Sequence, residues 1–184
     1  MQFPNEEFIG KNGIRYSLRS PNVEDAAKML DYLKATAEET EFGLSYPEEM
    51  NFTVKDEEEF IAHYASDSGS IMISAFDGDR LAGNASLCCV MDRKKTLHRA
   101  TFGIAIRKCD WGQGLGEQIV RALIAFAKQA GYELLELEVA SCNTSAIRLY
   151  DKLGFIVYGE RPCSLKLKNG DYYDELLMVL DLQA

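Results

Sequence analysis

Three glycines in the stretch CDWGQGLGEQIV, residues 109–120, stand on alternate positions directly before a run with helical periodicity. Glycine in the first turn of a helix costs up to about 1 kcal/mol relative to alanine, so this backbone freedom needs a reason. The preceding residues 99–106 alternate as a strand would. A strand that stops, a loop of exposed N–H groups and a helix N-terminus together favour binding of an anion to the main chain.

Two nucleotide-binding motifs fit this loop poorly. A P-loop requires Lys and then Ser or Thr after the last glycine, whereas Gly116 is followed by Glu117. A dinucleotide fingerprint requires a third glycine, and that position holds Glu117 or Ile119, depending on whether the count starts at Gly112 or Gly114. A flexible turn without a ligand is the remaining alternative. No lysine lies inside the loop, so main-chain N–H groups must carry the recognition, and a pyrophosphate suits them.

The rest of the chain alternates between strand and helix patterns, without repeats or low-complexity tracts. The patterns predict a mixed sheet with helices on both faces, which is an α/β architecture in one domain. The expected elements, in chain order, are a strand at 14–18, helices beginning near 22 and 53, two strands within 70–90 joined by a hairpin at 77–79, a strand at 99–106, a helix to 130, a strand at 134–139, a helix at 145–153 and strands at 155–160 and 175–182.

The charge of the chain is unevenly distributed. Residues 1–92 contain 7 Lys and Arg against 18 Asp and Glu, a balance of −11, whereas residues 93–184 contain 13 against 11, a balance of +2. Most of these charges are expected on solvated helix faces, but the asymmetry favours a cationic ligand for the acidic half. A net charge of −9 also makes nucleic acid a poor partner.

Cysteine and histidine usage excludes several classes of site. The five cysteines are odd in number and form no C-x-x-C pair, and only two histidines are present, so neither a disulfide framework nor a metal site is expected. No apolar run approaches the roughly 20 residues that would span a membrane, and the first residues do not form a secretory signal. The sequence therefore predicts a cytoplasmic protein without a membrane partner.

Two motifs at matching spacing carry a family resemblance. The first is the strand followed by the glycine loop; the second has the form N-x-x-A-x-x-x-Y-x-x-x-G-F and begins at Asn143. Residues 104–160 thereby resemble the core of the GNAT superfamily of N-acetyltransferases, and the order of elements extends the similarity to nearly the whole chain. The stretch KNGDYYDELLM, residues 168–178, further resembles the branch that includes ribosomal-protein, spermidine and phosphinothricin acetyltransferases.

The resemblance implies a single N-acetyltransferase domain over residues 1–184, with an acetyl-CoA core at about 99–160 and a mostly antiparallel sheet of about seven strands. It implies that the pantetheine arm of acetyl-CoA pairs with the strand that ends at 104–106. The family usually has Gln or Arg at the first loop position, where this chain has Trp111. The residues implied in cofactor binding are Ile104, Ala105, Ile106, Trp111, Gly112, Gln113, Gly114, Leu115, Gly116, Asn143 and Tyr150.

Tyr150 and Asn143 each have a structural alternative. Tyr150 has Ile147 and Leu153 three residues to either side and would serve as core packing. The resemblance instead directs its hydroxyl at the cofactor sulfur. A tyrosine with an ordinary pKa near 10 is protonated at neutral pH and can give a proton to the departing thiolate. Asn143 would be a plain helix cap, a role that is compatible with contact to the cofactor arm.

The sequence says less about the residues that bind the acceptor amine. The resemblance places the segment between the first two helices beside the acceptor, and Glu39, with Glu38 and Glu41 near it, is the predicted substrate-binding residue. The identity of the general base stays open. Glu136 and Glu138 share one face of their strand, and either could accept a proton, but an outward, solvated face is the favoured interpretation.

The chain is thus identified as resembling an acetyl-CoA-dependent N-acetyltransferase that uses direct transfer to a primary amine, with a small cationic molecule as the favoured acceptor. The alternatives are acetylation of a protein amino terminus and a non-catalytic acyl-CoA-binding module. The sequence leaves the oligomeric state open, and a homodimer is compatible with it.

Overall fold

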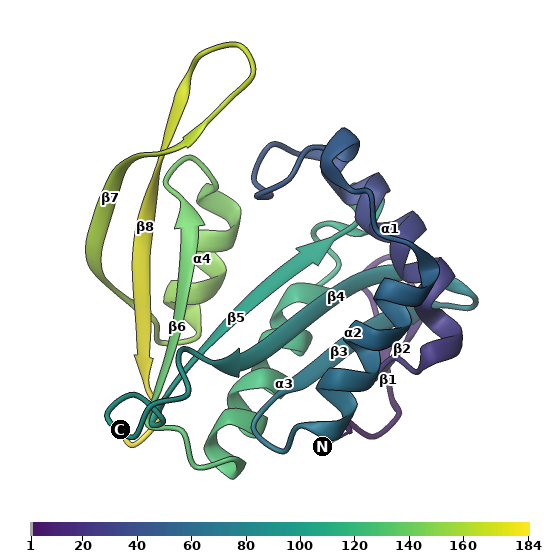
Figure 1. The fold of residues 1–184 in the computed structure, drawn as a ribbon, viewed down its shortest axis with the longest axis horizontal. Coiled ribbons are helices and arrows are strands. Elements are labelled where there is room, and N and C mark those ends of the chain that lie inside the picture. The colour runs from purple at the N-terminus through teal and green to yellow at the C-terminus, as the bar shows by residue number, and fades with distance from the viewer. Residues whose placement is uncertain (1) are drawn as a thin grey trace.

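A single eight-stranded sheet organises the computed structural model, which describes residues 2–184 (Figure 1). The spatial order is β1-β2-β3-β4-β5-β6-β8-β7, and every neighbouring pair is antiparallel except β5 with β6. The mixed, mostly antiparallel sheet predicted from the sequence is therefore confirmed. The strands are β1 (Glu6–Ile9), β2 (Arg15–Arg19), β3 (Ile71–Asp77), β4 (Arg80–Cys89), β5 (Arg99–Ile106), β6 (Leu134–Ala140), β7 (Ile156–Lys166) and β8 (Tyr172–Asp181).

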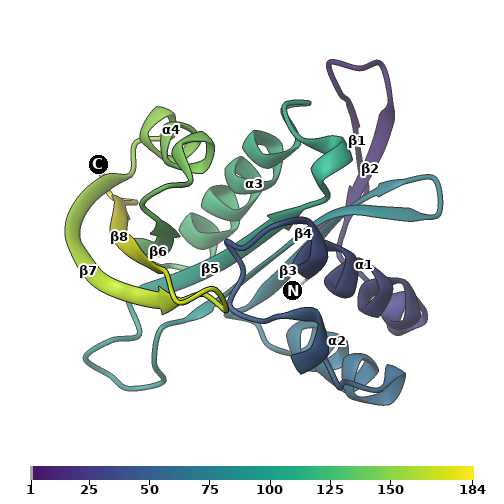
Figure 2. The same ribbon diagram turned by 90° about the horizontal axis from the view of Figure 1, so that it is seen from above.

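Helices cover both faces of the sheet, as expected. Helices α1 (Ala26–Glu39) and α2 (Val54–Ser66) lie side by side on one face, and α3 (Leu115–Gln129) and α4 (Thr144–Lys152) lie on the other (Figure 2). Each face has its own core. The larger core packs α3 and α4 against the middle strands, and the smaller one packs α1 and α2 against Met72, Phe76 and Leu81.

Helix α3 shows how the pattern of apolar residues determines the packing. Its buried positions recur at the spacing of one helix face and point onto the sheet. Complete burial of a leucine or isoleucine side chain stabilises the fold by about 1.5–3 kcal/mol. Six side chains of α3 are buried, and all of them except Phe126 are at most 1% exposed. The six are Leu115, Ile119, Val120, Leu123, Phe126 and Ala127.

The eighth strand, β1, was not predicted. Its sequence EEFI lacks the alternation that indicates a half-buried strand, and three of its four residues are exposed. The strand nevertheless pairs with β2, and its Phe8 ring stacks on Tyr16 at 6.3 Å between centroids. The turn after β1 also meets the glycine loop, because the Lys11 N–H donates to the Gln113 carbonyl at 3.3 Å. The hairpin of β1 and β2 therefore supports the predicted anion site from outside.

A buried ion pair fixes the chain just before the glycine loop. Asp110 is 2% exposed, and both of its carboxylate oxygens accept hydrogen bonds from Arg80, at 2.6 and 2.9 Å. The Tyr16 hydroxyl donates to the same carboxylate at 2.8 Å. Burial alone would raise the pKa of Asp110, but the Arg80 and Tyr16 hydrogen bonds outweigh it and the pKa is lowered. The carboxylate therefore ties the end of β5 to both β2 and β4.

We expect Asp110→Asn to lower the free energy of unfolding at pH 7 by about 3 kcal/mol, the usual size for breaking a buried pair. Because folding lowers the pKa of Asp110, its stabilisation is present above the unfolded pKa of about 3.9 and is lost as the pH falls through the folded value. Urea denaturation at pH 7 and in acid measures both effects. The exposed Asp92→Asn is the matched control, and an equal stability of the two variants at pH 7 would contradict the assignment.

Candidate active site

The central feature of the site is the separation of β5 from β6. The two strands pair in parallel at only three positions, the last of which joins Thr101 to Glu136. Beyond that point β5 continues to Ile106 beside β4, and β6 continues to Ala140 beside β8, so the two strands diverge as a V (Figure 1). A gap in the sheet leaves main-chain groups on both inner edges without a strand partner, and such groups can bind an extended ligand.

The hydrogen bonds of β5 show which residues face the gap. The Arg107 N–H donates to the Ala82 carbonyl at 2.9 Å, so Arg107 faces β4. The Ala105 carbonyl accepts a hydrogen bond from the Tyr32 hydroxyl at 2.6 Å on the same side. Main-chain groups of successive strand residues point to opposite sides. Ile104 and Ile106 therefore direct their main-chain groups into the gap, whereas Ala105 directs its own groups away from it.

Tyr32 is a residue that the sequence analysis missed. Its hydroxyl accepts a hydrogen bond from the Asn84 N–H at 3.0 Å while donating to Ala105, and it thus bridges β4 and β5 beside the gap. The ring is 2% exposed, and burial raises the pKa of its hydroxyl. The signal that could have found it is its position three residues after Met29, on the buried side of α1.

The glycine loop continues from the end of β5 into α3. Gly112 and Gly114 adopt φ values of +75° and +88°, which side chains rarely tolerate, and Gly114 is the N-cap of the helix. Because Gly114 has no side chain, it makes no capping hydrogen bond at this helix end. Glycine is needed at position 116 for a different reason. An added Cβ there would lie only 3.2 Å from the side chains of Ile106 and Leu149. The Leu115 side chain is buried in the core, so only its main chain can serve a ligand.

The side chains of Trp111 and Gln113 stabilise the glycine loop by donating hydrogen bonds to nearby main-chain carbonyls. The Trp111 indole N–H donates to the Ile106 carbonyl at 2.7 Å, and the Gln113 side-chain amide donates to the Trp111 carbonyl at 3.1 Å. Trp111 is nonetheless 43% exposed, so its ring remains available on the surface. Of the main-chain groups that Ile104 and Ile106 direct into the gap, one carbonyl is therefore already bonded to the indole.

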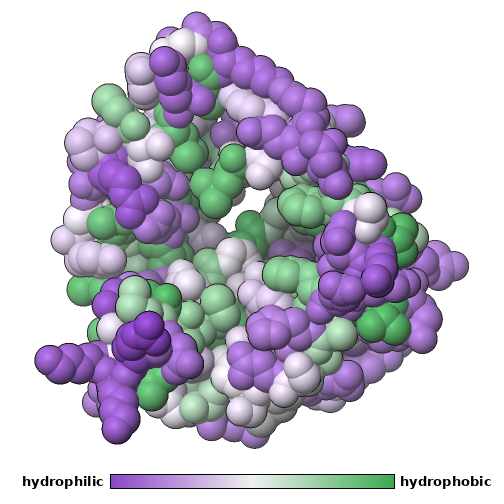
Figure 3. All heavy atoms as spheres, viewed as in Figure 1, coloured by the Kyte–Doolittle hydropathy of each residue, from purple (hydrophilic) through white to green (hydrophobic). Residues whose placement is uncertain are grey.

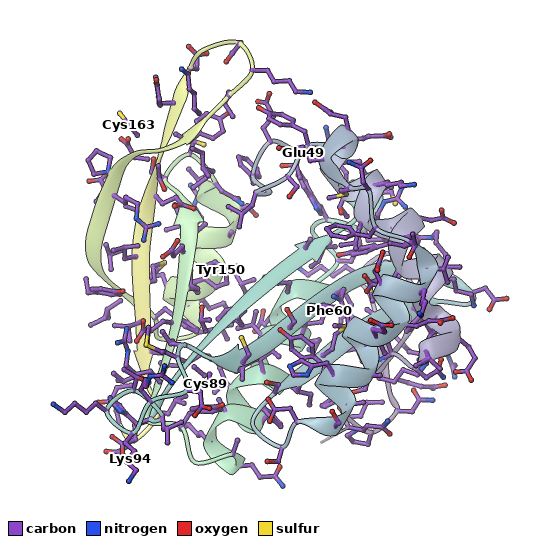
Figure 4. The ribbon with its side chains drawn as sticks, viewed as in Figure 1. Glu49, Phe60, Cys89, Lys94, Tyr150 and Cys163 are labelled. Atoms are coloured by element: carbon purple, nitrogen blue, oxygen red, sulfur yellow. The ribbon has the colours of Figure 1, made fainter. Side chains whose placement is uncertain are left out.

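Tyr150 lies at the narrow end of the gap, between α4 and β5 (Figure 4). Its ring packs edge-on against Phe102 and Phe155, with centroids 6.0 and 5.8 Å away. The residue is 6% exposed, and its hydroxyl has no hydrogen-bond partner among residues 2–184. Since these residues include no sealed, unpartnered side-chain oxygen, the hydroxyl still reaches solvent. Burial raises its pKa to about 12, so the group keeps its proton at neutral pH.

Asn143 occupies the turn between β6 and α4. Its side-chain oxygen accepts a hydrogen bond from the Ala146 N–H at 3.2 Å, which makes Asn143 the N-cap of α4. Its amide NH₂ donates to no described residue and is available to a ligand. The cap role expected from the sequence is thus confirmed, and the contact to a cofactor stays a prediction.

The Glu39 carboxylate is already bound by other residues of the protein. Its carboxylate accepts hydrogen bonds from the Arg107 side chain at 2.9 Å and from the Lys108 N–H at 2.6 Å. Burial would raise the pKa of Glu39, but these two donors outweigh it and the pKa is lowered. The predicted substrate-binding residue therefore joins the end of α1 to the end of β5. Arg107 was missed because its partner lies 68 residues away in the chain.

A cavity of about 630 Å³ opens next to Glu39, at the wide end of the gap. The molecule is visibly hollowed there, with hydrophobic residues in the wall (Figure 3). Four acidic and two basic side chains line the cavity, together with aromatic rings. The Tyr173 hydroxyl donates to Glu41 at 3.3 Å, and its ring lies 6.5 Å from that of Phe42. Within the described part of the chain no cation pairs with Glu38 or Glu41.

The hairpin between β7 and β8 contacts the segment after α1 and closes the cavity on one side. The Tyr46 hydroxyl accepts a hydrogen bond from the Lys168 N–H at 2.9 Å. The Lys168 ammonium lies 4.2 Å from the centre of the Tyr46 ring and pairs with Glu48. The β7–β8 hairpin on one side of the gap and the segment after α1 on the other side therefore contact each other.

Glu136 and Glu138, which the sequence left open as bases, are engaged in ion pairs. Arg99 binds both oxygens of Glu136, at 2.5 and 2.8 Å, and Arg161 binds both oxygens of Glu138, at 2.7 and 2.8 Å. Glu138, whose side chain is 49% exposed, agrees with the outward, solvated face that was favoured, whereas the Glu136 side chain is only 14% exposed. Residues 2–184 also contain no group of three or more potential metal ligands, and none of their helices is long and apolar enough to cross a membrane.

Comparison with known proteins decides the family. Residues 29–155, well over half of the chain, match the profile of the Acetyltransferase (GNAT) family. The chain belongs to this family. The L-methionine sulfoximine/L-methionine sulfone acetyltransferase of Pseudomonas aeruginosa is 33% identical over 79 residues, which are 43% of this chain and 45% of that protein. The chain spans less than half the length of several curated relatives that it matches.

Solved structures of proteins named as acetyltransferases share the fold over most of the chain. An acetyltransferase of the GNAT family from Streptococcus pneumoniae has a TM-score of 0.86 and 28% identity, covering 90% of this chain and 99% of that one. A putative acetyltransferase from Salmonella typhimurium, solved with acetyl-CoA, has a TM-score of 0.79 and 19% identity, covering 91% of this chain and 94% of that one. The GNAT fold expected from the sequence is confirmed.

Gln113 provides a charge test of the glycine loop. We expect Gln113→Glu to weaken acetyl-CoA binding roughly tenfold, since like charges repel, and Gln113→Lys to bind at least as tightly as the wild type. A negative charge near a helix N-terminus stabilises the helix, so Gln113→Glu should not unfold at lower temperature. Isothermal titration at two salt concentrations measures the difference, which should shrink at high salt. Equal affinities for all three proteins would mean that the phosphates bind elsewhere.

Proposed function

We propose that this chain is an N-acetyltransferase that moves the acetyl group of acetyl-CoA directly to a primary amine of a small, cationic molecule. One observation carries the proposal: the gap between β5 and β6 has a glycine loop at its open end and, at its narrow end, the Tyr150 hydroxyl, which no described residue binds. Family membership supports the same activity. The proposed domain comprises residues 1–184, with its acetyl-CoA core at about 99–160.

The binding groups of this chain lie in an order that matches the successive parts of acetyl-CoA. The free N–H groups of α3 and of the loop from Gly112 to Gly116 would bind the pyrophosphate, because a helix N-terminus attracts anions. The main-chain groups of Ile104 and Ile106 would pair with the amides of the pantetheine arm as an added strand does. The side-chain NH₂ group of Asn143 donates to no described residue and would bind the same arm. Trp111 and Ala105 remain proposed contacts through their exposed side chains.

Tyr150 would act on the leaving group. When the amine displaces sulfur from the acetyl carbon, the sulfur leaves as a thiolate, which the Tyr150 hydroxyl would protonate. A general acid must be protonated at the working pH, and the raised pKa of Tyr150, about 12, meets this condition. The ring contacts with Phe102 and Phe155 restrict the direction of the hydroxyl. Orientation of this kind reduces the entropy lost in the transition state.

The lining of the cavity supports a cationic acceptor. Among residues 2–184, no cation pairs with Glu41 or Glu38, and the rings of Phe42, Tyr173 and Trp111 offer faces that attract ammonium groups. Glu39 would contribute indirectly, through Arg107 and Lys108. The Pseudomonas aeruginosa relative is named for two small amino-acid derivatives, which supports a small acceptor. The five free cysteines support a reducing, cytoplasmic location.

A CoA-release assay tests the function. Purified protein with acetyl-CoA is offered polyamines, amino acids, aminoglycosides and short peptides with free amino termini. Release of CoA with a cationic small amine supports the proposal, whereas release only with peptides would indicate acetylation of protein amino termini. Binding of acetyl-CoA without release by any acceptor would indicate a non-catalytic acyl-CoA-binding module. Sedimentation of the same sample decides whether the protein is a homodimer.

Tyr150→Phe removes one hydroxyl and keeps the ring. We expect kcat to fall by roughly 10²–10⁴-fold, the usual range for losing a general acid, while the affinity for acetyl-CoA changes only a few-fold. Because the pKa of Tyr150 is raised to about 12, the wild type should show no decline in kcat from this group below about pH 10. Steady-state kinetics and a pH series measure both. Unchanged turnover would make Tyr150 a packing residue, and a parallel loss of affinity would make it a binding residue.

Glu41→Gln removes a carboxylate from the cavity and keeps its shape. We expect the KM for a cationic acceptor to rise about 5- to 20-fold, with the KM for acetyl-CoA nearly unchanged, because an ion pair in a partly enclosed site is worth about 1–2 kcal/mol. The exposed Glu59→Gln is the control for charge at a distance. Preference for a neutral or acidic acceptor, unaffected by Glu41→Gln, would contradict the cationic acceptor.

A further inference from the structure

The hydroxyl of Tyr32 connects two neighbouring strands of the sheet. Helix α1, which carries Tyr32, lies against β4 (Figure 1). The hydroxyl accepts a hydrogen bond from the Asn84 N–H at 3.0 Å and donates one to the Ala105 carbonyl at 2.6 Å. Asn84 and Ala105 are directly opposite each other in the β4–β5 pairing. Because the Arg107 N–H bonds to the Ala82 carbonyl two positions further along, this pair is of the hydrogen-bonded type, in which the N–H and the carbonyl normally bond to each other directly.

The Tyr32 ring is held in the smaller core. It is 2% exposed and lies in the same cluster as Met29, Ile61 and Met72. Burial raises the pKa of the hydroxyl, so the group keeps its proton and remains a donor at physiological pH. A phenylalanine ring would fill this core without a buried polar atom that needs hydrogen-bond partners. The hydroxyl therefore serves the strands and not the packing.

The bond from Tyr32 acts on the peptide group that joins Ala105 to Ile106. The C=O and the N–H of one trans peptide group point in opposite directions in a strand. Since the Ala105 carbonyl is directed at β4, the Ile106 N–H is directed into the gap. Donation of a hydrogen bond to the carbonyl polarises the amide and makes its N–H a stronger donor. Tyr32 therefore strengthens a donor on the opposite edge of β5.

The main-chain groups on both sides of this N–H are fixed as well. The Ile106 carbonyl accepts a hydrogen bond from the Trp111 indole at 2.7 Å, and the Arg107 N–H donates to the Ala82 carbonyl at 2.9 Å. Strand β6 pairs with β5 only as far as Thr101, so it does not hold this part of β5 from the gap side. The Ile106 N–H is thus oriented before a ligand arrives, and a preorganised donor loses little entropy on binding.

We propose that Tyr32 is a positioning residue for acyl-CoA binding, which orients and polarises the Ile106 N–H for an amide carbonyl of the pantetheine arm. This inference rests on the proposed function. Ile106 ends β5 beside the glycine loop, whereas Tyr150 lies at the narrow end of the gap. The N–H would therefore meet the amide part of the arm and not the thioester. No bond forms or breaks at Tyr32, and its effect is on affinity.

Tyr32→Phe tests the proposal, because it removes the hydroxyl and keeps the ring. Without the hydroxyl, the Asn84 N–H and the Ala105 carbonyl are left to bond to each other, so the fold should be kept. The peptide group is then held by an amide N–H, a weaker donor than a phenol, at a different position. We expect acetyl-CoA to bind about three- to tenfold more weakly and its KM to rise by the same factor. The kcat at saturation should stay within twofold, because the contact is the same in the ground state and the transition state.

Tyr132→Phe is the matched control. Tyr132 is also buried, and its hydroxyl donates to the main-chain carbonyl of Gly69 at 2.7 Å, before the start of β3 and not at β5. This variant loses a comparable hydrogen bond and should bind acetyl-CoA as the wild type does. Isothermal titration and steady-state kinetics measure both variants, and the urea midpoints show whether the two lose comparable stability.

Two further measurements separate positioning from a general loss of stability. The nucleotide half of CoA, 3′-phospho-ADP, has no pantetheine arm, so Tyr32→Phe should bind it as tightly as the wild type. The NMR amide resonance of Ile106 in the free protein should shift in Tyr32→Phe and stay in place in Tyr132→Phe, because only the first variant changes the donor to the preceding carbonyl. This second measurement does not depend on activity.

The possible results separate this inference from the proposed function. Equal affinities of Tyr32→Phe and the wild type for acetyl-CoA would overturn the inference alone. Equal losses for acetyl-CoA and 3′-phospho-ADP would also overturn it, since Tyr32 would then only stabilise the fold. An unmoved Ile106 resonance would exclude the peptide group as the route. A wild type that does not bind acetyl-CoA would overturn the proposed function, and this inference with it.

Discussion

The parting of β5 and β6 after three residue pairs is the constraint on which the rest of the structure depends. Main-chain N–H and C=O groups need partners, and a continuous sheet would supply them. In this sheet the inner edges of the gap lack that supply beyond Thr101 and Glu136. Among the described residues, the Ile106 carbonyl instead accepts a hydrogen bond from the Trp111 indole, and the Ala140 carbonyl accepts one from the Asn143 N–H. The fold holds the gap open with contacts at both ends. Phe102, Tyr150 and Phe155 fill the narrow end, and Arg107 with Glu39 fixes the wide end.

Local chemistry explains which of these features could be predicted from the sequence. The glycine loop, the Asn143 cap and the apolar side of α3 depend on residues a few positions apart, and each was recognisable. Strand β1 was not, because it is exposed and has no alternating pattern. The pairing of Glu39 with Arg107 and the bridge from Tyr32 to Ala105 join residues 68 and 73 positions apart, so no local pattern reveals them.

Charge on this protein has two distinct uses. Bidentate arginine pairs, such as Arg80 with Asp110 and Arg161 with Glu138, hold strand ends and loops in fixed positions. Within the described residues, the carboxylates of Glu38 and Glu41 at the cavity pair with no cation. The acidic excess of the first half of the chain is therefore partly consumed by structure and partly left for the cavity. The total charge alone would not have distinguished the two.

The order of the strands along the chain also determines the stage of synthesis at which the site can form. Strand β8, which follows the other seven strands along the chain, lies between β6 and β7, and its Tyr173 lines the cavity. During synthesis the N-terminal half, with β2 to β5 and their two helices, can complete its pairing while β6 still lacks its antiparallel neighbour. A growing chain therefore carries the glycine loop and α3 well before it has a cavity opposite them. Translation must pass residue 181 before the two walls of the gap face each other, so a partly made chain has no complete site in which to hold a thioester near an amine.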